Sequence, residues 1–160
     1  MKKIIFGLIV LMSASLYAQT ADTYLELLRS DIKNKRKTVV AVAMNLNELQ
    51  EEKFWSIYKE FETEWDKLAD VRVGIIKEYA ANIETLTDEV ADDLVQKSYD
   101  LEEDKLDVEK KYYKKVKDQL GAKQAGKFIQ VVSRLNMLIN IQIAAELPLF
   151  PVDADTTGSM

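Results

Sequence analysis

Apolar residues recur along this chain at steps of three, four and seven, the spacing that places them on one face of a helix. In the longest such pattern, four residues lie seven apart: Phe54, Phe61, Leu68 and Ile75. A second series, interrupted by Arg72, contains Tyr58, Trp65 and Tyr79. Spacing of this kind over several heptads is typical of coiled coils. It predicts one continuous helix over 48–84, about 55 Å long at 1.5 Å per residue.

Three further segments have helical patterns. The segment 22–44 carries a stripe formed by Leu25, Leu28, Ile32, Val39 and Val42. Another helix is expected to begin after Thr87, whose hydroxyl suits an N-cap and is followed by acids. The segment 122–146 is apolar on nearly all sides, so other helices or a second subunit must cover it. Prolines end it, and 148–160 is expected to be a disordered tail.

These segments predict an all-α fold, an elongated four-helix protein with long coiled-coil-like antiparallel helices in a single domain over 19–147. Two prolines and five glycines in 160 residues leave few breaks between long helices. The wide apolar stripes also predict a homodimer. Six residues are expected to be buried inside the subunit or at its interface: Phe61, Trp65, Leu68, Val132, Leu135 and Ile139.

The first eighteen residues have the pattern of a secretory signal peptide. Lys2 and Lys3 precede a short apolar run, and small residues suited to cleavage end at Ala18. The run is too short to span a bilayer, which needs roughly 20 apolar residues. An uncleaved anchor is the alternative. The pattern favours export to the periplasm, with cleavage near Ala18 and no stable membrane insertion afterwards.

Composition argues against several function classes. Loss of Lys2 and Lys3 takes the net charge from −5 to −7, which disfavours binding to nucleic acid. The chain has no His and no Cys, so the commonest catalytic base and the strongest nucleophile are missing. The usual zinc and copper ligands are missing for the same reason. We therefore expect no enzyme activity, no cofactor and no metal site.

Two clusters of basic residues stand out in this acidic chain. The first consists of Lys33, Lys35, Arg36 and Lys37. Its simplest interpretation is a solvated helix face, and the alternative is a binding patch. The second runs from Lys110 to Lys117 and follows an acidic stretch of the same helix. Because cations stabilise a helix C-terminus, we interpret this run first as a helix end and only second as a binding patch.

Two helix starts share a short motif. Leu46, Gln50, Lys53 and Phe54 recur 74 residues later as Leu120, Gln124, Lys127 and Phe128. In the first copy Asn47 can cap the helix, while Gln50 at the third position reaches back to the Asn47 backbone. In the second copy Gly121 would be the cap and Gln124 the third position. A capping box with a Leu and Phe anchor accounts for every matched residue without any ligand.

The paired Leu-x-x-x-Gln starts, in a short exported helical chain, resemble the Spy/CpxP family of periplasmic proteins, whose mark is a Leu-Thr-x-x-Gln motif. Both copies here lack the Thr, while Leu86-Thr87 lacks the Gln. The resemblance implies a thin, curved helical dimer that binds unfolded proteins on its concave face without ATP, under envelope-stress regulation. Two departures are the acidic charge and the absence of His, which metal-sensing relatives use.

Two functions are compatible with these features. The first is an ATP-independent periplasmic chaperone, a holdase or envelope-stress protein that binds unfolded polypeptides on apolar helical surface. The alternative is a dedicated regulator of one envelope or signalling protein, and a purely structural helical protein is a third. The candidate client-binding residues are Trp55 and Val73, with charge from Lys33, Lys35, Arg36 and Lys37. Trp55 and Val73 lie at the margin of the helical stripe, where they either pack under another helix or stay partly exposed.

Overall fold

The computed structural model describes residues 35–151, and the chain divides into two units, 1–43 and 44–160. Residues 35–44 are helical, and Asn45 follows with φ 45°, the left-handed conformation that commonly ends a helix. The predicted signal peptide 1–18, the remainder of the first predicted helix and the tail residues 152–160 lie outside the described residues.

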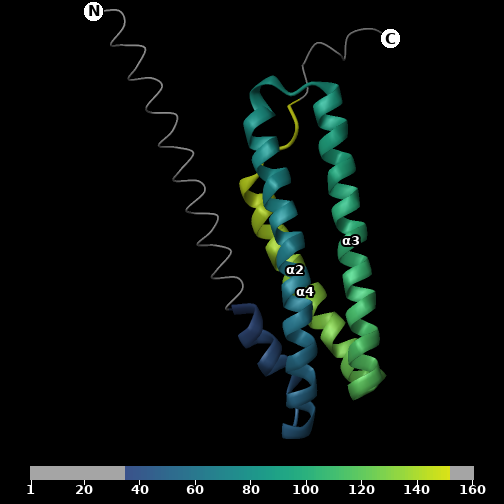
Figure 1. The fold of residues 1–160 in the computed structure, drawn as a ribbon. Coiled ribbons are helices and arrows are strands. Elements are labelled where there is room, and N and C mark those ends of the chain that lie inside the picture. Colours follow the sequence, from purple (N-terminus) through teal and green to yellow (C-terminus); the bar gives the residue numbers. More distant parts are fainter. Residues whose placement is uncertain (1–34, 152–160) are drawn as a thin grey trace, which may run out of the picture. The chain divides into compact units, whose positions relative to one another are not determined.

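The helix predicted over 48–84 is α2, Glu48–Asn82, and the 3-10 turn η1, Ile83–Thr85, continues it (Figure 1). At 1.5 Å per residue α2 is about 50 Å long. The prediction of one continuous helix is confirmed. Its last turn tightens into η1, as often happens at helix ends.

Helix α3, Asp88–Leu120, begins as predicted after Thr87, whose hydroxyl accepts a hydrogen bond from the Val90 N–H at 3.4 Å. Four ion pairs between described residues join α3 to α2: Lys97 with Glu78, Glu102 with Arg72, Lys111 with Glu64, and Lys115 with Glu60. As the partner on α3 moves toward its C-terminus, the partner on α2 moves toward its N-terminus. The two helices are therefore antiparallel (Figure 1).

A single residue, Gly121, joins α3 to α4, Ala122–Glu146. Its φ of 85° and ψ of 162° lie in a region that only glycine adopts without strain. The Gly121 N–H donates to the Lys117 carbonyl at 2.9 Å, and its own carbonyl accepts from the Ala125 N–H at 3.1 Å. Gly121 thus ends one helix and begins the next.

Helix α4 packs against α3 and begins at the end of the unit where α2 begins and α3 ends (Figure 1). After α4 the chain returns to α2. The Tyr79 hydroxyl donates to the Pro148 carbonyl at 3.0 Å, and the rings of Tyr79 and Phe150 lie 5.2 Å apart. The first residues of the segment predicted as a disordered tail therefore pack against α2.

The core of the unit 44–160 lies largely where α2, α3 and the first half of α4 meet. Its buried aromatic and aliphatic residues include Phe54, Tyr58, Phe61, Trp65, Leu101, Tyr112, Val116, Phe128 and Val132. Of the six residues predicted to be buried, Phe61, Trp65 and Val132 are buried in the single chain. Leu68, Leu135 and Ile139 are only half-buried in it. The described residues contain helices and no strands, which confirms the predicted all-α class.

Candidate functional site

The two copies of the repeated motif meet at one end of the unit. Phe54 and Phe128 are fully buried, and their rings pack edge to face with centroids 5.5 Å apart. Tyr58 and Phe61 complete an aromatic cluster around Phe128, with centroids 6.4 and 5.1 Å from it. Leu46 and Leu120 are half-buried. The motif phenylalanines are buried anchors, as the structural interpretation of the motif expects, and the structure adds that they anchor the two helix starts to each other.

The motif glutamines have different roles. Asn47 Oδ1 accepts from the Gln50 N–H at 3.0 Å, and Gln50 Oε1 accepts from the Asn47 N–H at 3.2 Å. This reciprocal pair is the predicted capping box. Gln124 forms no such box, so the prediction was wrong for the second copy: the Gly121 cap has no side chain, and its N–H is already bonded to Lys117.

The motif lysines differ as well. The Lys127 ammonium donates to the Met44 carbonyl at 2.9 Å, whereas Lys53 is exposed. Met44 is the last residue of the helix that contains 35–44, so its carbonyl is one of those that the helix leaves unpaired. Lys127 compensates that helix end with a charge-assisted hydrogen bond.

Trp55 and Val73, the predicted client-binding residues of α2, are both half-buried. The Trp55 ring packs edge-on against Phe54 and Tyr58, with centroids 5.3 and 5.4 Å apart. Of the predicted basic cluster, Lys33 lies outside the described residues, Lys35 and Lys37 are exposed, and Arg36 is buried. The basic cluster belongs to the unit 1–43 and Trp55 to the unit 44–160, so their assignment to one site stays a prediction.

The basic run of α3 pairs with acids on α2. The Lys111 ammonium lies 2.6 Å from Glu64, which also accepts from the Tyr112 hydroxyl at 2.9 Å. Lys115 pairs with Glu60, and its ammonium lies 4.9 Å from the centroid of the Tyr112 ring. Hydrogen bonding from Lys111 lowers the pKa of Glu64, while burial and the bond to Glu64 raise the pKa of Tyr112. Part of the run therefore joins helices, a role the sequence interpretation missed.

The second half of α4 is exposed and apolar. Met137, Leu138 and Ile141 are each 60% exposed. By length and composition α4 would also be apolar enough to cross a membrane, and only 11% of its most apolar window is buried. The expectation that other helices cover this segment is met only in its first half. We call Met137, Leu138 and Ile141 the α4 apolar strip.

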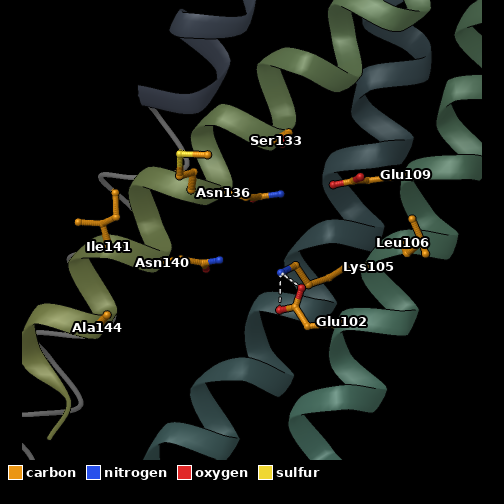
Figure 2. A pocket seen from close by; sticks show the side chains of 10 residues that line it. Glu102, Lys105, Leu106, Glu109, Ser133, Asn136, Asn140, Ile141 and Ala144 are labelled. Carbon is orange, nitrogen blue, oxygen red and sulfur yellow. Dashed lines mark hydrogen bonds and ion pairs between the residues drawn. The ribbon is translucent and has the colours of Figure 1, made fainter. Parts of the chain in front are cut away.

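A groove of about 590 Å³ opens beside this strip, between α3 and α4 (Figure 2). Its α3 wall consists of Glu102, Lys105, Leu106 and Glu109. Its α4 wall consists of Ser133, Asn136, Met137, Asn140, Ile141 and Ala144. In Figure 2 Asn136 and Asn140 point toward the α3 wall, while Ile141 points away from it. The groove thus has polar groups inside and apolar residues on its rim.

The charged groups of the groove come from successive turns of α3. Lys105 is 6% exposed, and its ammonium lies 2.7 and 2.9 Å from the two carboxylate oxygens of Glu102. An Arg72 nitrogen on α2 lies 3.9 Å from Glu102. Burial raises the pKa of Glu109, with Lys105 acting in the opposite direction and Glu102 adding to the rise. The wall therefore presents one ion pair and one partly buried carboxylate.

Sequence reasoning did not find this groove, although one signal for it exists. Ser133, Asn136 and Asn140 are polar residues three and four apart on an otherwise apolar helix, which places them on one face. Among residues 35–151 no group of three His, Cys, Asp or Glu side chains could hold a metal ion. The groove offers hydrogen bonds, charge and apolar contact to a ligand.

Comparisons with protein-family models, curated proteins and solved structures found no match to this chain. The resemblance to the Spy/CpxP family therefore stays a prediction.

Proposed function

We propose that this protein is an exported, ATP-independent chaperone that holds unfolded polypeptides in the groove and on the two residues of the α4 apolar strip that line it, Met137 and Ile141. The observation that carries the proposal is the 60% exposure of Met137, Leu138 and Ile141 beside an open groove. Exposed apolar patches with polar surroundings commonly mark interaction sites. The predicted signal peptide and the resemblance to the Spy/CpxP family support a periplasmic location and this class of activity.

Apolar contact suits a holdase because it is non-directional and does not require one particular sequence. Trp55 is a second candidate contact, since its half-buried ring lies at the edge of the aromatic cluster. Weak binding to unrelated clients separates this proposal from the alternative, a dedicated regulator that binds one folded partner tightly.

The strip also has a side that faces away from the groove, and we propose that the protein forms a homodimer through that side. Leu138 does not line the groove, whereas Met137 and Ile141 do. Residues 135–145 carry no charge, so two copies of this face can approach each other without repulsion between like charges. We therefore assign Leu138 to self-association, and Met137 and Ile141 to client contact.

The test is a light-scattering assay of two unrelated denatured proteins, without ATP, in the presence of the chain lacking its predicted signal peptide. We expect the protein to slow aggregation of both clients and Ile141→Ser to weaken this protection. Leu49→Ser is the matched control, because Leu49 is also apolar and is 80% exposed, but lies at the start of α2. Circular dichroism verifies that both variants remain helical.

Three results would point elsewhere. If a several-fold excess of the protein protects neither client, the chaperone proposal is rejected. The dedicated regulator of one partner then becomes the favoured function. Equal loss of protection in Ile141→Ser and Leu49→Ser rejects the groove rim as the contact. Flotation of the protein with neutral lipid vesicles, abolished by Ile141→Ser, would assign the strip to a membrane. Sedimentation tests the dimer separately, since Leu138→Ser should shift a dimer toward monomer.

A further inference from the structure

Glu109 is the one carboxylate of the groove that has no ion-pair or hydrogen-bond partner among residues 35–151. Its neighbours do not supply one, because the Lys105 ammonium is held by both oxygens of Glu102. The Glu109 side chain is half-buried, so its charged form is poorly solvated and its pKa is raised. A partly buried carboxylate in this position is stabilised by any cation that enters the groove.

The opposite wall carries hydrogen-bonding groups that are also unused. The side chains of Ser133, Asn136 and Asn140 form no hydrogen bond with the described part of the chain, and the two amides point into the groove (Figure 2). An asparagine side chain offers both a donor and an acceptor, as a peptide group does. These amides can therefore pair with the backbone of a bound polypeptide.

The rim is apolar on both sides. Leu106 on α3 is 51% exposed, and Met137 and Ile141 on α4 are 60% exposed. The lining as a whole has two carboxylates against one ammonium, so it favours a cationic occupant over an anionic one. A ligand that matches both features has a positive charge for the interior and apolar side chains for the rim.

We propose that the groove between α3 and α4 binds a polypeptide segment in which a Lys or Arg lies between apolar residues, with the cation paired to Glu109. The neighbouring apolar side chains lie on Leu106, Met137 and Ile141, and Asn136 and Asn140 bond the segment's backbone. The inference rests on the proposed chaperone function and names the class of client segment that the groove selects.

The experiment measures fluorescence anisotropy of short labelled peptides mixed with the chain lacking its predicted signal peptide. The first peptide combines Leu with Lys, the second replaces each Lys with Glu, and the third keeps Lys but replaces each Leu with Ser. We expect the Leu and Lys peptide to bind most tightly. Glu109→Gln should weaken its binding about fivefold, the upper range for a partly exposed ion pair. Glu103→Gln, an exposed acid of α3 outside the groove, is the control and should leave binding unchanged.

The outcomes separate this inference from the proposed function. Equal binding of the Lys and Glu peptides, or no effect of Glu109→Gln in a folded protein, overturns the selection of cationic segments. Protection of unrelated clients would in that case still support the chaperone. A different outcome is that the protein binds the Leu and Lys peptide selectively and protects no client. That result would support the assignment of the groove and reject the general holdase. Failure of all three peptides to bind overturns the inference.

Discussion

Phe54 of α2 and Phe128 of α4 pack edge to face, with ring centroids 5.5 Å apart and planes inclined at 80°. They occupy equivalent positions in the two motif copies, and neither has exposed surface. Their contact places the start of α4 against the start of α2. The two copies of the motif lie 74 residues apart in the sequence. They meet at this contact, which joins the start of α2 to the start of α4.

We expect this contact to contribute about 0.5–1.5 kcal/mol of coupling beyond simple burial, as edge-to-face aromatic pairs do. The measurement is a double-mutant cycle of Phe54→Leu and Phe128→Leu, followed by urea unfolding. The control cycle combines Phe54→Leu with Tyr79→Leu at the far end of α2, where distant sites should add without coupling. Equal coupling energies in the two cycles would contradict a specific contribution of the Phe54–Phe128 contact to stability.

The motif glutamines provide a second prediction. Gln50→Ala removes one half of a reciprocal capping box and should cost about 0.5–2 kcal/mol of unfolding free energy. Gln124→Ala should cost less, because Gln124 makes no capping bond to Gly121. Chemical denaturation of the two variants compares them directly. A larger loss for Gln124→Ala would mean that its side chain has a role the helix start does not explain.

Gly121 allows a sharp test of backbone strain. Gly121→Ala should destabilise the protein by about 1–3 kcal/mol, since φ 85° and ψ 162° are accessible essentially only to glycine. A Cβ at this position would meet no atom within 4 Å, so the cost comes from the backbone alone.

Gly74→Ala is the matched control for that strain. Gly74 lies inside α2, where an added Cβ also meets no atom within 4 Å. Alanine is the better helix former by roughly 0.5–1 kcal/mol, so this substitution should stabilise the protein. Thermal unfolding should therefore give shifts of opposite sign for the same chemical change. Shifts of the same sign would contradict the assigned conformation of Gly121.

Local sequence signals predicted the helix boundaries well. Asn47 with Gln50, Thr87 and Gly121 each mark a helix start that the structure confirms. These signals work because caps and left-handed turns depend on a few neighbouring residues. The same locality explains the error at Gln124. The second copy of the motif matches the first, but its cap residue, Gly121, directly follows α3. The Gly121 N–H already donates to a carbonyl of that helix and cannot bond to Gln124.

The exposed half of α4 and the groove could not be predicted in the same way. Periodicity identifies which face of a helix is apolar, but it does not tell whether another helix reaches that face. Phe128 and Ile141 are equally suited to a core, yet the first is fully buried and the second is 60% exposed. The difference depends on where α3 and α4 separate, a tertiary property. Interhelical pairs such as Lys111 with Glu64 depend on register for the same reason.

Removal of the charge at Glu64 of α2 and at Glu109 of α3 should change the stability of the protein in opposite directions. The pKa of Glu64 is lowered, first by the hydrogen bond from Lys111, so its ionised form stabilises the fold above the unfolded pKa near 4.5. That stability is lost as the pH falls through the lowered pKa. The pKa of Glu109 is raised, first by burial, so its ionisation opposes folding increasingly as the pH rises from the unfolded pKa near 4.5 to the raised pKa, and fully above it.

At pH 7 Glu64→Gln should therefore lower the melting temperature, and Glu109→Gln should raise it. The effect of Glu64→Gln should be small, because this pair is partly exposed and screened by solvent. Both differences from the unsubstituted protein should shrink in acid, as the native glutamates become protonated. Differential scanning calorimetry at neutral and acidic pH measures all of these shifts. A lower melting temperature for Glu109→Gln at pH 7 would indicate that Glu109 has a stabilising partner within the folded chain. The groove would then already hold the cation that we assign to a client.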